Sequence, residues 1–260
     1  MSSERKKYYM NQYKDFASIY DELINTDIDY NTWADKIIDI CTEKNIDRRD
    51  YLDLACGTGN MTIEIAKYFR NTWAVDKSTQ MLTEAEGKLR ASHIKAKFVA
   101  QDISCLNLNH KFDLITCCLD STNYILEEQD LIGYFKGVYS HLKDEGLFVF
   151  DVNSFYKLTE ILANNTFTFD NEEVVYIWDN FLEDDIVEMN LTFFVKENDH
   201  YMRFDEVHCE KAFREGYLEG VLKAVGFEIL EKFNNYESKT IGADCERIAY
   251  VLSKAREEMK

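Results

Sequence analysis

The sequence predicts an α/β fold: a doubly wound, seven-stranded, mostly parallel sheet that carries an antiparallel β insertion. Three observations lead to this prediction. Short apolar runs alternate with amphipathic segments over residues 51–152, a glycine-rich turn follows the first run, and extended aromatic stretches replace the alternation over residues 155–213. Strands that alternate with helices pair in parallel through right-handed crossovers. A chain of 260 residues is long enough for one large domain with such an insertion.

The first predicted element is a helical region, because aromatic and apolar residues recur at helical spacing from Tyr8 to Thr42. Short apolar runs then predict strands at residues 51–55, 72–75, 97–100, 112–119 and 146–152. Amphipathic spacing predicts helices between them at residues 61–69, 78–89 and 126–142.

The second half of the chain begins with the insertion. Its β-branched and aromatic stretches lie at residues 167–169, 174–178, 186–195 and 201–204, separated by acidic turns. A helix from Glu215 to Ala224, capped by Gly226, and strands at 227–232 and 247–252 then complete the sheet. We therefore expect one domain from residues 1–154 and 214–260, with residues 155–213 forming a lid over the substrate.

Composition restricts the classes of partner. The 30 lysines and arginines face 48 aspartates and glutamates, which gives a net charge of −18. An anionic surface repels phosphate backbones, so we do not expect a nucleic acid partner. No signal peptide or apolar run long enough for a membrane span is present, and seven scattered cysteines and five histidines lack metal-ligand spacing. We expect a cytoplasmic protein with reduced thiols and no metal; the oligomeric state is open.

The glycine-rich turn carries the first functional signal. Gly57 and Gly59 lie between a predicted strand and a helix, where residues without a side chain let the backbone approach a ligand. A dinucleotide-binding turn would have a third glycine at the position of Thr62. Asp53, inside the preceding strand, offers a carboxylate to a cationic amino-acid ligand. This pattern favours a nucleoside with an amino-acid portion over NAD.

Here the sequence resembles the class I S-adenosylmethionine-dependent methyltransferases, over residues 8–153 and the terminal strands. Their first motif is an acidic residue followed by Gly-x-Gly-x-Gly, and Asp53-Leu54-Ala55-Cys56-Gly57-Thr58-Gly59 fits it with Ala55 at the first glycine. The resemblance implies S-adenosylmethionine as cofactor and S-adenosylhomocysteine as product. It also implies methyl transfer to a nitrogen or oxygen of an acceptor, for which the charge favours a small molecule.

The resemblance also assigns residues to the cofactor. Asp76 matches the residue that holds the ribose hydroxyls, and Asp102 the one beside the adenine amine. The whole expected set is Tyr13, Asp53, Ala55, Gly57, Gly59, Asp76, Lys77, Met81, Gln101, Asp102, Ile103 and Leu119. Each carboxylate has a simpler interpretation: Asp53 bonds the turn, Asp76 caps the next helix, and Asp102 belongs to an ordinary turn. Their common place at strand ends, where doubly wound sheets bind ligands, favours the cofactor site.

Two further clusters are candidates for acceptor binding. Family members place the reacting atom beside the loop after the fourth strand, which here contains Asp120, Asn123 and Tyr124. The alternative is a helix N-cap. The segment from Tyr13 to Asp21 resembles the Tyr-x-x-Phe-Ala-x-x-Tyr-Asp motif of a bacterial subgroup, which implies Tyr13 at the cofactor carboxylate and Tyr20 at the substrate. Plain core packing is the more frequent explanation of such an aromatic stripe on a helix.

No catalytic residue is assigned, because methyl transfer from a sulfonium depends mainly on alignment and desolvation. His208 could act as a general base, but a strand histidine between acidic residues is more often simply solvated. Three alternatives stay open: a non-catalytic S-adenosylmethionine-binding regulator, methylation of RNA or protein, and an NAD-dependent oxidoreductase. Cofactor binding without turnover on any acceptor would indicate the first, and binding of a nicotinamide cofactor would indicate the last.

Overall fold

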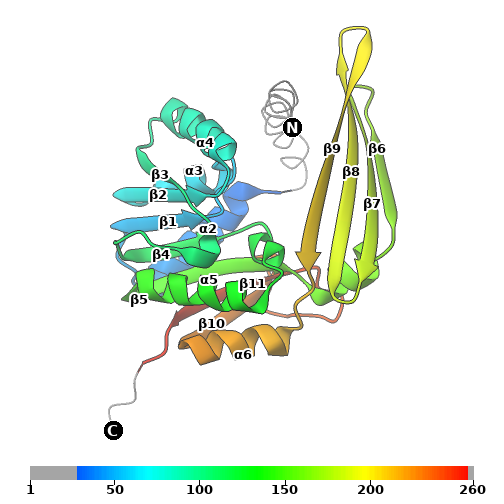
Figure 1. The fold of residues 1–260 in the computed structure, drawn as a ribbon. Coiled ribbons are helices and arrows are strands. Elements are labelled where there is room, and N and C mark those ends of the chain that lie inside the picture. The colour runs from blue at the N-terminus through cyan, green and yellow to red at the C-terminus, as the bar shows by residue number, and fades with distance from the viewer. Residues whose placement is uncertain (1–27, 257–260) are drawn as a thin grey trace.

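The protein, seen in a computed structural model that describes residues 28–256, consists of two β-sheets with helices packed on the larger one (Figure 1). The larger sheet has seven strands in the order β10-β11-β5-β4-β1-β2-β3. Strand β11 runs opposite to the six other strands of this sheet, which confirms the predicted mostly parallel sheet. Its strands are β1 (Asp50–Leu54), β2 (Asn71–Asp76), β3 (Ala96–Ala100), β4 (Phe112–Cys117), β5 (Leu142–Asn153), β10 (Phe227–Asn234) and β11 (Arg247–Lys254).

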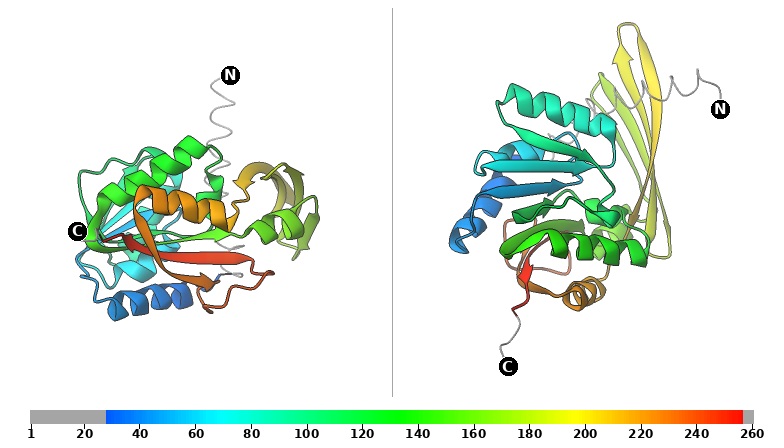
Figure 2. Two further views of the ribbon diagram at one scale, coloured as in Figure 1. Left: turned by 90° about the horizontal axis from the view of Figure 1, so that it is seen from below. Right: turned by 60° about the vertical axis from the view of Figure 1, so that its left-hand side comes forward.

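Helices cover both faces of this sheet (Figure 2). The helices are α2 (Tyr30–Glu43), α3 (Asn60–Ala66), α4 (Thr79–Ala91), α5 (Glu128–His141) and α6 (Glu215–Val225). The apolar faces of α5 and α6 pack on one side of the sheet and those of α2 and α3 on the other. Alternate residues of a strand supply the two cores: in β5, Phe148 and Phe150 join the first, and Leu147 and Val149 the second. Among residues 28–256, no helix is long and apolar enough to cross a membrane.

The insertion forms the second sheet, an antiparallel meander in the order β6-β7-β8-β9, which projects from the rest of the molecule (Figure 1). Its strands are β6 (Thr166–Asp170), β7 (Val174–Glu183), β8 (Ile186–Glu197) and β9 (His200–Lys211). Strand pairing places aromatic rings on one face, where Phe193 stacks on Phe204 with ring centroids 4.8 Å apart. The predicted antiparallel insertion is confirmed.

Some boundaries differ from the sequence predictions for physical reasons. β4 ends at Cys117 instead of residue 119, because Leu119 has a positive φ that a strand cannot contain. Helix α3 ends at Ala66, three residues early. A π-helix, η3 (Lys157–Leu162), was not predicted within the insertion; its signal is the pair Leu158 and Leu162, four residues apart and both buried. The predicted helical residues before 28 lie outside the described part of the chain.

Candidate active site

The candidate site lies where the winding of the sheet reverses, between β1 and β4. The chain leaves β1 for α3 on one face of the sheet and leaves β4 for α5 on the other. Ligands of doubly wound sheets bind at such a switch point, outside the carboxyl ends of the strands. Because parallel strands end at one edge, the segments 55–59, 76–77, 101–103 and 119–124 are brought to the same edge of the sheet.

The conformation of the glycine turn is stabilised by Asp76, the last residue of β2. Gly57 and Gly59 have φ of +53° and +83°, and Ala55 at the start of the turn has φ of +50°. Gly57 N donates to Asp76 Oδ2 over 2.9 Å, and Ser78 N donates to Asp76 Oδ1 over 2.8 Å. The Asp76 carboxylate therefore binds the backbone of both the loop after β1 and the loop after β2.

The two glycines differ in what surrounds them. A Cβ at Gly57 would meet no atom of residues 28–256 within 4 Å, so this part of the chain leaves room for a ligand beside the backbone. A Cβ at Gly59 would lie 3.0 Å from Leu89 Cδ1 and 3.1 Å from Ala85 Cβ, both on α4. Gly59 therefore permits close packing of the turn on α4, whereas Gly57 leaves a space that suits a cofactor.

We expect Gly59→Ala to destabilise the protein more than Gly57→Ala. Both substitutions place a Cβ at a positive φ, which costs about 1 kcal/mol. Only Gly59→Ala also forces a methyl group against α4, which adds about 1–3 kcal/mol. Urea denaturation of both variants measures the free energies of unfolding. Equal losses would contradict the packing role of Gly59.

Asp53 lies beneath the turn, fully enclosed by protein. Its Oδ2 accepts from Thr62 Oγ1 over 2.5 Å, and its Oδ1 accepts from Thr116 Oγ1 over 2.8 Å. Burial raises the pKa of Asp53 to about 6, although both hydroxyl bonds act against that rise. Thr62, at the position of a dinucleotide motif's third glycine, thus supports the Asp53 carboxylate. The carboxylate ties β1 to α3 and β4.

The segment after β3 borders the same edge. Asp102 Oδ1 accepts from Ser104 N over 2.9 Å and from Ser104 Oγ over 2.7 Å, and these bonds lower the pKa of Asp102. Gln101 N donates to Asp76 O, which joins this segment to β2. Around them, Met81 and Ile103 are half-buried and Lys77 is exposed. The residues expected around the adenine are therefore gathered together, while Tyr13 and Tyr20 lie outside the described residues.

The loop after β4 separates the three predicted acceptor contacts. Asn123 is fully buried, and its amide binds backbone groups: Nδ2 donates to Asn153 O and Lys211 O, and Oδ1 accepts from Asn153 N. Asp120 does not cap the following 3-10 helix, η2 (Ser121–Tyr124). Its Oδ1 instead accepts from Arg247 Nη2 over 2.6 Å. Asn123 therefore joins β5 to β9, and Asp120 is part of an ion pair.

Tyr124 connects the loop after β4 to strand β9 of the insertion. Its side chain is 41% exposed, and its hydroxyl lies 3.4 Å from His208 Nδ1 on β9. The two rings meet edge to face, with centroids 5.8 Å apart. Burial lowers the pKa of His208, although the charge of Asp120 acts in the opposite direction. His208, which sequence analysis left unassigned, therefore stands beside the loop after β4 as a neutral imidazole near pH 7.

A buried polar network under this loop was not predicted from the sequence. Asp151 on β5 is fully buried and accepts from the backbone N–H groups of Leu119 and Asp120, from Tyr236 Oη and from Arg247 Nη1. A carboxylate inside the otherwise apolar run of residues 147–152 was the available signal. No neighbouring residues in the sequence indicated a role for Arg247, since its partners Asp151 and Asp120 are 96 and 127 residues away.

Glu210 on β9 extends this network into the insertion. It is buried and accepts from Asn153 Nδ2 over 2.8 Å, while Lys157 Nζ donates to Asn153 Oδ1 over 3.0 Å. Burial raises the pKa of Glu210 to about 8, assisted by the charge of Asp120. Near pH 7 the Glu210 side chain is therefore mostly a neutral acid.

We expect Glu210→Gln to flatten the pH dependence of stability. With a folded-state pKa of about 8 above the usual 4.5, the native state binds this proton more tightly than the unfolded state. The resulting stabilisation is present below pH 4.5 and is lost as pH rises towards 8. Glutamine stays neutral at every pH. The free energy of unfolding of the variant, relative to that of the wild type, should therefore rise by more than about 1 kcal/mol between about pH 5 and pH 8.5. Urea denaturation at both pH values measures this change.

Glu172→Gln, on an exposed turn of the insertion, controls for the lost charge and should follow the wild type at both pH values. A Glu210→Gln variant with the pH dependence of the wild type would show that Glu210 is ionised in the native state.

The chain matches known proteins over the elements that build this site. The family described as "Methyltransferase domain" matches residues 52–146. YqeM of Bacillus subtilis (strain 168), whose name places it among the methyltransferases, is 33% identical over 247 residues, which cover 94% of this chain and 98% of YqeM. A solved S-adenosylmethionine-dependent methyltransferase from Clostridium acetobutylicum ATCC 824 is 51% identical, with a TM-score of 0.90, over 94% of this chain and 99% of that one. The chain belongs to the class I S-adenosylmethionine-dependent methyltransferases.

A more distant solved structure shares the fold of this methyltransferase. DesVI of Streptomyces venezuelae has a TM-score of 0.77 at 22% identity, and the match covers 92% of this chain and 98% of DesVI. Both the seven-stranded sheet and the antiparallel insertion lie within the matched length, since so little of either chain is left out.

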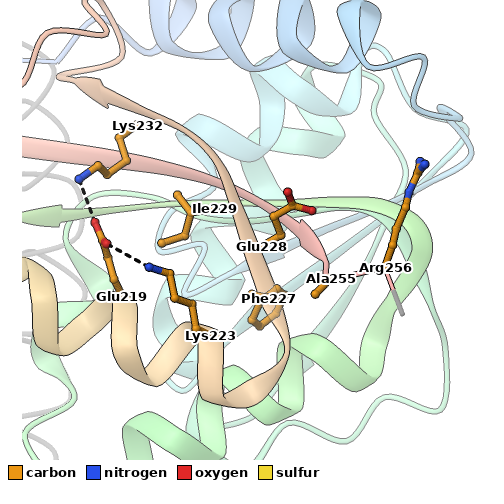
Figure 3. A pocket seen from close by; sticks show the side chains of 8 residues that line it. All are labelled: Glu219, Lys223, Phe227, Glu228, Ile229, Lys232, Ala255 and Arg256. Carbon is orange, nitrogen blue, oxygen red and sulfur yellow. Dashed lines mark hydrogen bonds and ion pairs between the residues drawn. The ribbon is translucent and has the colours of Figure 1, made fainter. Parts of the chain in front are cut away.

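A cavity of about 730 Å³ lies away from the candidate site of the methyltransferase, between α6 and the edge strand β10 (Figure 3). Three of its charged side chains pair with one another, since Glu219 contacts both Lys223 and Lys232. None of the residues within 28–256 that are predicted to bind cofactor or acceptor lines it. The geometry of the switch point, and not this cavity, therefore carries the functional assignment.

Proposed function

We propose that this methyltransferase transfers a methyl group from S-adenosylmethionine to a nitrogen or oxygen of a small-molecule acceptor and releases S-adenosylhomocysteine. The observation that carries the proposal is the convergence of four loops on one sheet edge at the switch point, with the glycine turn and Asp76 bonded together there. When bound, the cofactor supplies an electrophilic methyl group on a sulfonium. The protein orients it and excludes water.

The predicted cofactor residues fit this role. The open space at Gly57 admits the amino-acid and ribose portions, and Asp76 presents a carboxylate that suits a pair of ribose hydroxyls. Asp102 is held by Ser104 so that its carboxylate stays ionised beside the position proposed for the adenine amine. Met81 and Ile103 offer the apolar surface that an adenine ring requires. Tyr13 remains a predicted contact.

The acceptor enters, in this proposal, between the loop after β4 and β9 of the insertion. Tyr124 and His208 meet there, and Asp120 lies close enough for its charge to act on His208. These groups suit an amine: the Asp120 carboxylate attracts its cationic form, and a neutral imidazole accepts the proton that the nitrogen must release. In this proposal Asn123 does not contact the acceptor but binds the backbone of Asn153 and Lys211. Residues 155–213 form the acceptor side of the site.

Relatives support an amine acceptor. The dTDP-3-amino-3,4,6-trideoxy-alpha-D-glucopyranose N,N-dimethyltransferase of Streptomyces venezuelae is 24% identical over 222 residues, covering 83% of this chain and 91% of that one. The name of this relative specifies methylation of a nitrogen on a small molecule. This resemblance, together with the net charge of −18, favours a small cationic or neutral amine over a polyanion.

Calorimetric titration with S-adenosylmethionine, S-adenosylhomocysteine and NAD tests the cofactor assignment. We expect binding of the two sulfur ligands and none of NAD. A coupled assay for S-adenosylhomocysteine release, run over amino sugars and small amino acids, then tests the acceptor class, with His208→Asn as the matched variant. Binding without turnover on any acceptor would favour a regulatory protein, and binding of NAD alone would overturn the proposal.

A further inference from the structure

Two consecutive residues in the loop after β4 have a conformation that their side chains disfavour. Leu119 has φ of +62° and Asp120 has φ of +48°, both in the left-handed region. Glycine adopts this region freely, whereas a leucine there is uncommon because its Cβ approaches the following carbonyl oxygen. Such strained residues persist only where surrounding contacts determine them, and they concentrate at functional sites. Some other group must therefore hold this turn.

Asp151 is that group. Its Oδ2 accepts from Leu119 N over 2.9 Å, and its Oδ1 accepts from Asp120 N over 2.8 Å. One carboxylate thus binds both backbone amides of the strained pair from the neighbouring strand β5. Because Asp151 is fully buried, these bonds are shielded from water and fix the direction of both amides.

Two residues in turn hold Asp151. Tyr236 Oη donates to Asp151 Oδ2 over 2.8 Å. Arg247 on β11 donates Nη1 to Asp151 and Nη2 to Asp120 Oδ1, the latter over 2.6 Å. Trp33 on α2 covers this group, with its ring 5.4 Å from the Arg247 guanidinium and 4.6 Å from the Tyr236 ring. Arg247 therefore fixes the Asp120 side chain while Asp151 fixes the backbone of the same residue.

We propose that Asp151 and Arg247 are positioning residues, which hold the Leu119–Asp120 turn in its left-handed conformation and so form one wall of the cofactor crevice. The proposal rests on the proposed function, since it takes Leu119 as a cofactor contact and Asp120 as a group that faces the acceptor. Neither Asp151 nor Arg247 needs to touch a ligand. Their effect passes through the backbone and side chain that they fix.

A double-mutant cycle with S-adenosylhomocysteine as the probe tests this. Asp151→Asn should weaken its binding about tenfold, because one amide of the turn loses its partner. In a Leu119→Gly background the same substitution should weaken binding by only about threefold or less, because glycine adopts the left-handed conformation without support. Hydrogen–deuterium exchange of peptides containing residues 118–121 should rise in Asp151→Asn, and it needs no ligand.

Asp113→Asn is the matched control. Asp113 is similarly buried and accepts from Asp50 N and Lys143 Nζ at the opposite end of β4. This variant should lower Tm without changing S-adenosylhomocysteine affinity. Equal losses of affinity from Asp151→Asn in both backgrounds, or unchanged affinity and exchange, would overturn the positioning role. Failure of the wild type to bind the probe would instead count against the proposed function, and the exchange measurement would still decide the role of Asp151.

Discussion

Asp76→Ala is expected to abolish measurable binding of S-adenosylmethionine and S-adenosylhomocysteine. The carboxylate accepts from Gly57 N and Ser78 N and is the proposed partner of the ribose hydroxyls. Hydrogen bonds to a charged group contribute about 1.5–3 kcal/mol each. Loss of the ribose contacts together with the ordered turn should therefore weaken binding by more than about 100-fold, measured by calorimetric titration.

Two variants sharpen this prediction. Asp76→Asn keeps one acceptor oxygen and should fall between the wild type and Asp76→Ala. Asp130→Ala, on the exposed side of α5, removes a carboxylate elsewhere and should bind both ligands as the wild type does. Retention of tight binding by a folded Asp76→Ala would show that the ribose is held by another group.

Arg247→Met should cause the largest loss of stability among the substitutions considered. The guanidinium is buried between Asp120 and Asp151, and its removal leaves two carboxylates close together without a cation. Removing one partner of a buried ion pair costs about 3–5 kcal/mol, because the remaining charge is uncompensated. Urea denaturation followed by circular dichroism measures the free energy of unfolding.

Arg256→Met provides the surface comparison. Its side chain is 87% exposed and lies 3.5 Å from Glu145, so its loss should change stability by less than about 1 kcal/mol. Similar losses for the two variants would mean that water screens the charges around Arg247. In that case the network would contribute little to the stability of the native state.

The fold, and the meeting of the segments that contain the expected cofactor residues at one edge of the sheet, could be predicted because their signals are local. Alternating apolar runs identify the strands, and a carboxylate directly after a run, such as Asp76 or Asp102, marks the end of a strand. Parallel pairing then brings these ends to one edge without any knowledge of tertiary contacts. The glycine turn adds a backbone requirement that few other residues satisfy.

The contacts on the proposed acceptor side could not be predicted to the same degree, because they join distant parts of the chain. Tyr124 and His208 are 84 residues apart, and no local pattern links them. Asn123 looks like a surface loop residue in sequence, yet both ends of the insertion use its amide. The residues next to Leu119 in the sequence likewise do not predict its positive φ, since Asp151, which binds its amide, lies 32 residues away.

The amide of Asn123 has a consequence for how such an enzyme can diversify. It binds Asn153 O, where the insertion begins, and Lys211 O, where the insertion ends. The projecting sheet therefore leaves and rejoins the rest of the molecule at two backbone carbonyl groups that one side chain binds (Figure 1). A segment exchanged between these two residues would therefore have to keep Lys157 and Glu210, which both bind the side chain of Asn153. The two sheets share no strand pairing, so the projecting strands can vary beyond these residues without altering the pairing of the larger sheet.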